Sequence, residues 1–199
     1  EKPIPYLGGT PILLSISPWF LTYPEYFFPF IVMWTVGFVD DKRGLSPKVR
    51  LFMELAGGFS ISYIIFGYSF FDSTILAFVF AVAVNAYNMV DGLDGICAGN
   101  TIIFAIFAFI AGFSPDISLA IAGAFAGYLM YNFPPAKIFM GDQGSYLAGT
   151  FVGLLLIQSW ESQNFVRIAA FCWPVVLDLF IGFARRSLAG KSPLKGDRD

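Results

Sequence analysis

Residues 73–95 read STILAFVFAVAVNAYNMVDGLDG, and this stretch changes character along its length. Up to position 84 its side chains are almost all apolar, whereas asparagine or aspartate occupies positions 85, 88, 91 and 94. The apolar part indicates a helix in an apolar environment. The polar part, with Gly92 and Gly95, indicates where that helix leaves this environment, so the fold depends on which solvent surrounds the apolar part.

The composition of the whole chain identifies that solvent as lipid. Of its 199 residues 57% are hydrophobic and 13% are charged, and the mean hydropathy is +0.70. A soluble domain usually carries about 25% charged residues, so this chain lacks the material for a hydrated surface. The net charge of −2 gives no indication of a nucleic-acid partner. There is no histidine, so any acid–base or metal chemistry in these residues must use carboxylates, amides, water or substrate.

Apolar stretches alternate with short polar ones and predict an all-α fold, a polytopic membrane helical bundle of about eight spans. Several of the stretches are shorter than the ~20 residues of a typical spanning helix, and prolines interrupt the first two, which could form a kinked or re-entrant hairpin. We expect one transmembrane domain over residues 1–199. The predicted spans are 10–22, 27–39, 50–67, 73–87, 100–113, 117–131, 145–159 and 165–184.

The basic residues predict the orientation in the membrane. With alternating loops, eleven of the twelve lysines and arginines fall on one side, and Arg167 alone falls on the other. Positive charge marks the cytoplasmic side of a membrane protein. We therefore expect a multi-pass protein of the inner (plasma) membrane, with the side that carries Lys48 and Arg185 facing the cytoplasm.

Three acidic clusters fall on the same predicted side, around Asp40-Asp41, Asp91 to Asp94, and Asp142. The first two follow inward-running spans and so lie at helix C-termini, where each acid costs roughly 0.3–1 kcal/mol against the helix dipole. A bound divalent cation would reverse that cost, because it becomes the largest local charge. The alternative is that these acids are solvated loop residues that balance nearby lysines and arginines, which explains one cluster more easily than three.

The second cluster indicates the kind of cation. Asn85, Asn88 and Asp91 are spaced so that a continuing helix would place them on one face. Their oxygen ligands suit a hard ion such as Mg²⁺, which takes one or two carboxylates together with substrate phosphates and water. The residues therefore predict a Mg²⁺–diphosphate site at the membrane surface. A Walker-type phosphate loop is absent from the sequence, which argues against an ATPase.

Five blocks of sequence resemble the polyprenyl-phosphate N-acetylhexosamine-1-phosphate transferase family, glycosyl transferase family 4. They occur in the order and at the spacing of that family and cover nearly the whole chain. The blocks are Pro3–Gly9, Asp40–Pro47, Asn85–Gly95, Phe139–Ser145 and Gly190–Arg198. The resemblance implies Mg²⁺-dependent transfer of a sugar phosphate, with Mn²⁺ as a substitute ion, from a UDP-sugar to undecaprenyl or another polyprenyl phosphate, with release of UMP.

The resemblance also implies roles for individual residues. Asn88 and Asp142 would bind Mg²⁺, and the catalytic group would comprise Asp40 and Asp41 at the phosphate-transfer centre with Asp91 and Asp94 beside the nucleotide. Phe139 would stack on uracil and Arg198 would contact diphosphate or sugar, with Asn85 and Lys48 also among the substrate-binding residues. Lys48 could instead only mark topology, and Phe139 could only anchor the membrane interface. Tyr6, near the end of a predicted span, also reads as an interface residue.

The details resemble the branch that makes carriers for O-antigen (lipopolysaccharide) and other surface polysaccharides, most closely with UDP-GlcNAc as donor. The alternative within the family is the muramoyl-pentapeptide phosphotransferase of cell-wall peptidoglycan synthesis. From another class, a membrane transporter with an acidic ion site would place its acids near mid-membrane in paired repeats, and no repeat is seen. The family has a histidine-containing motif just after the position of Asp199 and a first span that these residues lack, so we expect a chain truncated at both ends. The resemblance also allows a homodimer.

Overall fold

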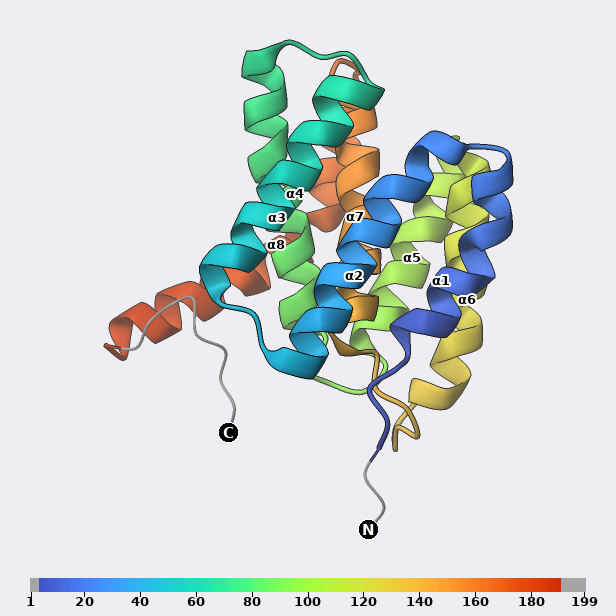
Figure 1. Cartoon of the computed structure of the whole chain (residues 1–199), viewed down its shortest axis with the longest axis vertical. Coiled ribbons are helices and arrows are strands. Elements are labelled where there is room, and N and C mark those ends of the chain that lie inside the picture. Colours follow the sequence, from blue (N-terminus) through green and yellow to red (C-terminus); the bar gives the residue numbers. More distant parts are fainter. Residues whose placement is uncertain (1–3, 191–199) are drawn as a thin grey trace.

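The apolar stretches form helices at the positions where spans are predicted (Figure 1). The structure is a computed structural model that describes residues 4–190, and no strand occurs within this range. The all-α prediction is confirmed for these residues. The helices, in chain order, are Gly9–Ile16 (α1), Phe27–Arg43 (α2), Pro47–Ser60 (α3), Phe70–Val90 (α4), Ile96–Ile110 (α5), Pro115–Asn132 (α6), Gly141–Gln158 (α7) and Phe165–Leu188 (α8).

Capping residues and prolines explain several helix boundaries. Ser46 caps α3 by accepting the N–H of Val49, and Pro47 occupies its first position, where no hydrogen bond is lost. In the predicted first hairpin, α1 continues as a 3₁₀ turn at Ser17–Leu21 (η1), and a second 3₁₀ turn, Pro24–Tyr26 (η2), precedes α2. The proline-rich segment is thus interrupted, as its sequence predicts.

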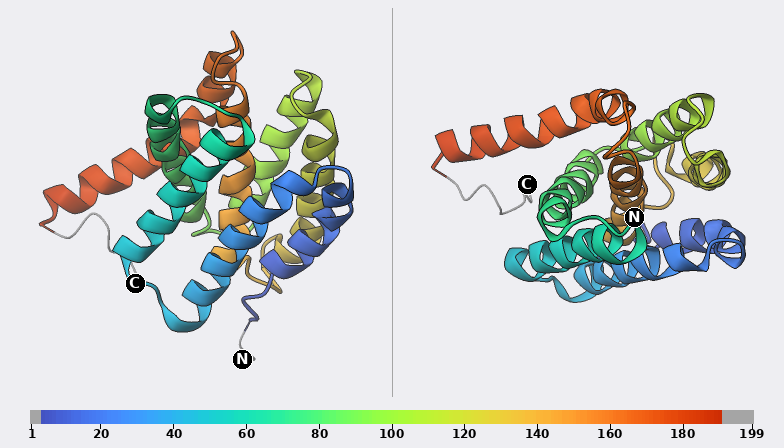
Figure 2. Two further views of the ribbon diagram at one scale, coloured as in Figure 1. Left: turned by 45° about the horizontal axis from the view of Figure 1, so that its top comes forward. Right: turned by 90° about the horizontal axis from the view of Figure 1, so that it is seen from above.

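Helix α7 forms the centre of the bundle (Figure 2). Nearly every residue of α7 from Gln143 to Ile157 is buried, with α2 and α4 as its principal neighbours. Gly37 allows α2 to approach closely, because a Cβ at that position would lie 2.5 Å from the backbone of Asp142 and Gln143. The start of α7 is therefore held directly against the end of α2.

Two helices within residues 4–190 are both long and apolar enough to cross a membrane, α4 and α8. The segments Gly9–Leu21 and Ile96–Ile110 are apolar but shorter. The eight predicted spans correspond to eight helices, but their crossing of a membrane stays a prediction. Large apolar side chains nevertheless face outward around the bundle, among them Leu14, Ile64, Phe71, Ile110 and Met130. Such an apolar exterior fits a surface that faces lipid.

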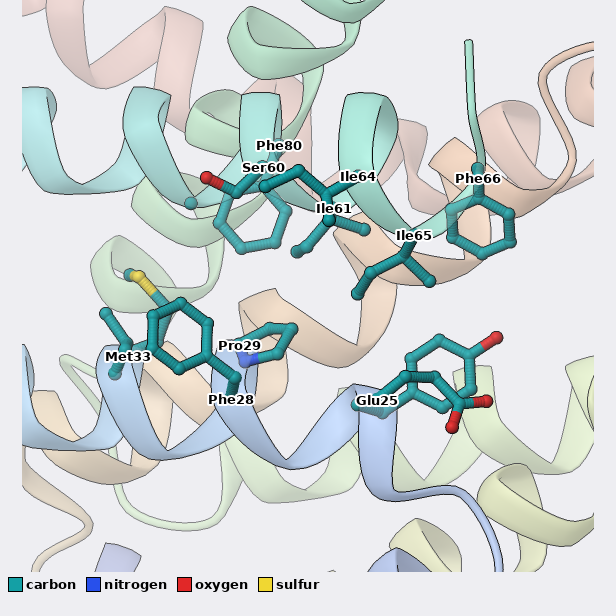
Figure 3. A pocket seen from close by; sticks show the side chains of 13 residues that line it. Glu25, Phe28, Pro29, Met33, Ser60, Ile61, Ile64, Ile65, Phe66 and Phe80 are labelled. Carbon is teal, nitrogen blue, oxygen red and sulfur yellow. The ribbon is translucent and has the colours of Figure 1, made fainter.

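An apolar groove of about 820 Å³ separates the N-terminal part of α2 from α3 and the π-helical turn Ile61–Ile65 (η3) (Figure 3). Phe28 and Met33 line it from α2, and Ile61 and Ile64 face them from η3. The acidic residues of α2 lie at the other end of that helix. The three acidic clusters therefore lie at the end where α2 and α4 finish and α7 begins (Figure 1).

Candidate active site

Asp41 joins the last turn of α2 to the first turn of α7. Its carboxylate accepts the N–H groups of Asp142 at 2.8 Å and Gln143 at 3.3 Å. The N–H groups of a first helical turn have no partner within their own helix, so a carboxylate there satisfies them and complements the helix dipole. Gly141 has φ +69, and a Cβ on it would lie 2.6 Å from the Asp41 carboxylate. The junction between α2 and α7 therefore requires both the carboxylate of Asp41 and the glycine at position 141.

Asn88 and Asp142 meet beside this junction. The Asn88 amide donates to Asp142 Oδ1 at 2.6 Å and to Ser145 Oγ at 3.0 Å. The two residues belong to the ends of α4 and α7, which lie 54 positions apart in the chain. A carboxylate and a carboxamide side chain thus lie together, the two residue types that the sequence predicts for a hard cation.

Negative charge is concentrated around this pair. Burial, with added repulsion from Asp142 and Asp41, raises the pKa of Asp91 to about 8. Burial also raises the pKa of Asp142 to about 6, against the Asn88 hydrogen bond, which lowers it. The pKa of Asp41 is raised by burial as well, and the hydrogen bonds from the start of α7 act in the opposite direction. Carboxyls that disfavour one another's ionisation in this way would be stabilised by a cation placed among them.

The donor set also bears on how a metal could be held. Within residues 4–190 no three acidic or cysteine side chains are placed to hold a metal ion by themselves. Mg²⁺ is usually bound by one or two carboxylates, with substrate phosphates and water completing its shell. Asp142, with the amide of Asn88, fits such an incomplete protein site better than it fits a closed structural one.

Asp40, adjacent to Asp41, takes part in a different set of contacts. Its Oδ2 lies 3.1 Å from the Arg50 guanidinium and accepts a hydrogen bond from the Tyr146 hydroxyl at 3.3 Å. Its Oδ1 accepts the N–H of Leu45 at 2.6 Å. The carboxylate is therefore paired on both oxygens, and it connects the α2–α3 turn, α3 and α7.

Asn85 lies one turn before Asn88 and faces a buried acid. Its amide donates to the carboxylate of Glu54 on α3 and to the carbonyl of Ala81 at 2.9 Å. Only 1% of the surface of Glu54 is exposed, and its second carboxylate oxygen has no hydrogen-bond partner among the described residues. The predicted substrate contact of Asn85 is untested, and the structure shows a contact between α3 and α4 instead.

A small pocket of about 190 Å³ lies next to the acidic cluster. The lining residues belong to the N-terminal segment, the turn after α4, the end of α6 and the start of α7. They are Tyr6, Asp91, Gly92, Leu93, Asp94, Asn132, Phe139, Met140 and Gly141. Asp94 also accepts the N–H of Ala136 at 3.0 Å, which holds the loop before Phe139 in place. The structure thus gathers Asp91, Asp94 and Phe139, the three residues that the resemblance assigns to the nucleotide.

Two predicted substrate contacts stay predictions. Lys48 is exposed in the first turn of α3, where both of its predicted roles stay open. Arg198 lies outside the described residues. The centre of the site is built from the ends of α2 and α4 and the start of α7.

Gln143 is a site residue that the sequence analysis did not single out. It is fully buried, accepts a hydrogen bond from Thr10 at 2.8 Å, and donates to the carbonyl of Tyr6 at 3.0 Å and to Asp41 at 3.2 Å. It therefore connects the N-terminal segment, α1, α2 and α7. Its position inside the Phe139–Ser145 block was the available signal, but an isolated glutamine after an aspartate reads equally well as a solvated loop residue.

An apolar helical bundle with a carboxylate–amide pair and an aromatic pocket at one end has the features of a membrane enzyme that handles charged ligands. Residues 24–160, more than half of the chain, match the family model described as glycosyl transferase family 4. The chain belongs to glycosyl transferase family 4, which confirms the resemblance found in its sequence. With the apolar exterior of the bundle, this membership supports a membrane protein.

Curated relatives come from two branches of the family. The phospho-N-acetylmuramoyl-pentapeptide-transferase of Chloroherpeton thalassium is 31% identical, over 77% of this chain and 58% of its own length. The decaprenyl-phosphate N-acetylglucosaminephosphotransferase of Mycolicibacterium smegmatis is also 31% identical, over 82% of this chain and 51% of its own length. The chain thus spans between half and three fifths of the length of these relatives.

Proposed function

We propose that the protein containing this chain transfers an N-acetylhexosamine 1-phosphate from a UDP-sugar to polyprenyl phosphate in the membrane and releases UMP. The observation that carries the proposal is the meeting of Asn88 and Asp142 beside a pocket lined by Asp91 and Phe139. A cation-binding pair next to a pocket with an aromatic wall matches a nucleoside diphosphate, whose phosphates need a cation and whose base can stack. The names of the relatives describe the transfer of a phospho-N-acetylhexosamine unit, and one of them also names decaprenyl phosphate.

In the proposed reaction an oxygen of the lipid phosphate attacks the β-phosphorus of the UDP-sugar. The bond between that phosphorus and the bridging oxygen breaks, and UMP leaves with the bridging oxygen. Such a transfer depends mainly on positioning and on stabilisation of charge. A phosphate monoester has a second pKa of about 6, so the lipid phosphate is largely dianionic at neutral pH and needs no strong base.

The residues of the site divide this work. Asn88 and Asp142 would hold Mg²⁺, and the bound ion would neutralise charge on the diphosphate. Asp41 fixes the start of α7 and so fixes the position of Asp142. Phe139 would stack on the base, with Asp91 and Asp94 beside the nucleotide. Arg50, held by Asp40 at the turn between α2 and α3, keeps positive charge close to the acidic cluster.

The lipid acceptor requires an apolar surface that reaches this end of the bundle. An apolar cavity of about 460 Å³ lies between α4, α7 and α8, and Ala86 and Tyr87 line it immediately before Asn88 in the chain. We propose that the site opens toward lipid here. The basic asymmetry of the sequence supports a plasma-membrane location with the site on the cytoplasmic side.

Two donors remain as candidates. UDP-GlcNAc, used for O-antigen or another surface polysaccharide, is the donor that the sequence motifs favour. UDP-N-acetylmuramoyl-pentapeptide is the second candidate, because relatives of both branches are 31% identical to this chain. Both donors carry the same uridine diphosphate, so the site described above suits either of them.

The test is turnover by the full-length protein. Purified protein with polyprenyl phosphate and Mg²⁺ is offered UDP-GlcNAc, UDP-N-acetylmuramoyl-pentapeptide and other UDP-sugars in parallel, and UMP is measured. We expect UMP release that requires both the lipid phosphate and the metal. Failure to release UMP from every donor, by protein shown to be folded, would contradict the proposed function, and the preferred donor decides between the two branches.

A further inference from the structure

The N-terminal segment before α1 is hydrogen-bonded to the loop that leads into α7. The N–H of Phe139 donates to the carbonyl of Pro5 at 2.9 Å, and the N–H of Gly8 donates to the carbonyl of Phe139 at 3.0 Å. The buried Gln143 side chain donates to the carbonyl of Tyr6. The backbone of Tyr6 is therefore fixed on both sides by contacts that do not involve its own side chain.

The ring of Tyr6 is directed at Phe139. The two ring centroids lie 5.0 Å apart, and the ring planes form an angle of 49°. Both rings line the 190 Å³ pocket. A flat base needs about 3.5 Å of separation on each face, so it cannot insert between rings this close together. The two rings instead form a corner, in which a base stacked on Phe139 would have its edge against Tyr6.

The exposure of Tyr6 argues that this corner is built for a ligand. The side chain is 58% exposed although its backbone is fixed, so the ring contributes little to the packed core. A tyrosine that only anchored the membrane–water interface would need no more than a position near the end of a span. Its position against Phe139, in a pocket that also contains Asp91 and Asp94, is more specific than that reading requires.

We infer that Tyr6 forms the second wall of the base pocket and makes the site selective for a single-ring base over a two-ring base. The reason is steric, because the corner of Tyr6 and Phe139 forms part of the wall of a pocket of only about 190 Å³. The inference rests on the proposed function, since it assigns the base of the UDP-sugar to this pocket. It adds a specificity-determining side chain from a segment far from the acidic motifs in the sequence.

The test measures binding of UMP and AMP, in the presence of Mg²⁺, to the full-length protein and three single variants. Tyr6→Ala removes the wall, Tyr6→Phe retains the ring, and Tyr131→Ala is the control. Tyr131 is 61% exposed, lies at the end of α6 that contributes Asn132 to the pocket, and does not itself line the pocket. We expect Tyr6→Ala to weaken UMP binding about 3- to 10-fold, as for the loss of one aromatic contact. The affinity for AMP should fall by a smaller factor or should rise, so the preference of the protein for UMP over AMP should decrease.

Tyr6→Phe and Tyr131→Ala should retain both the affinity and the preference of the wild-type protein. A purely structural role for Tyr6 would lower the affinities for both nucleotides in proportion and leave their ratio unchanged, and that result would overturn the inference. The inference would also be overturned if Tyr6→Ala left the UMP affinity unchanged while Phe139→Ala weakened it. That result would leave the proposed function intact. A wild-type protein that neither binds UMP nor releases it from any UDP-sugar would overturn both.

Discussion

The carboxylate of Asp41 accepts the backbone N–H of Asp142 at 2.8 Å, although the two residues are 101 positions apart in the chain. An acid in the last turn of α2 thus sets the first turn of α7, on which the proposed metal ligand lies. Stability and activity are expected to depend on this junction together, because a shift at the start of α7 moves Asp142 relative to Asn88. The predictions below separate the two effects.

Replacing Gly141 by alanine is expected to destabilise the protein. The new Cβ would lie 2.6 Å from the Asp41 carboxylate, at a residue with φ +69, where a side chain is strained. The matched control is Gly127→Ala on α6, where nothing lies within 4 Å of the added Cβ. That change should keep stability or raise it by about 0.5–1 kcal/mol. Thermal unfolding in detergent compares the two variants. Equal melting temperatures for Gly141→Ala and Gly127→Ala would contradict the proposed packing of Gly141 against Asp41.

Replacing Gln143 by alanine is expected to lower stability by about 2–4 kcal/mol. The substitution removes three side-chain hydrogen bonds in a fully buried position and leaves the Thr10 hydroxyl without its acceptor. Gln158→Ala serves as the control, because that glutamine is exposed at the end of α7 and its side chain accepts a hydrogen bond from the Ser114 hydroxyl. Denaturant or thermal unfolding should show a large effect for the first variant and a small one for the second. Similar effects would mean that Gln143 does not organise the site.

Asp142→Asn and Asn88→Ala should each remove most of the transferase activity while the protein stays folded and extractable. Asn88→Ala removes one oxygen ligand, and Asp142→Asn removes the negative charge of the other, from a cation site that has few protein ligands. Glu161→Gln, an exposed change in the turn after α7, is the control and should retain activity. The measurement is UMP release over a series of Mg²⁺ concentrations. Near-wild-type turnover of Asp142→Asn at low Mg²⁺ would rule out Asp142 as a ligand.

Transfer is expected to be direct, without a phosphorylated aspartate. Both oxygens of Asp41 accept hydrogen bonds from the start of α7, and both oxygens of Asp40 are paired as well. A carboxylate engaged in this way is a poor nucleophile, whereas the lipid phosphate is already a competent one. Lipid-free enzyme should therefore not exchange labelled UMP into UDP-sugar. Robust exchange without lipid that disappears in Asp40→Asn or Asp41→Asn would establish a covalent route instead.

Much of the fold could be predicted from the chain because each helix carries its own signal. The apolar run over 73–87 appears as α4, Phe70–Val90, and Pro47 after Ser46 marks the start of α3. The clustering of acids at one end was also predictable, since helices of alternating direction bring every second loop to the same side. Membrane crossing does not follow from the length and composition of every helix. Within residues 4–190, α4 and α8 are long and apolar enough to cross a membrane and the other helices are not.

The sequence by itself determined the all-helical class, the positions of the helices and the kind of chemistry at one end. These follow from local composition and spacing, which act within one helix or one loop, whereas the resemblance to the family named Asn88 and Asp142 as candidate ligands. Only the tertiary structure decided that Asp41 caps α7, that Gln143 is buried among three segments, and that the Tyr6 ring forms a corner with Phe139. The physical reason is that each of these contacts joins residues more than a hundred positions apart, so the packing of α2, α7 and the N-terminal segment determines them and no local pattern records it.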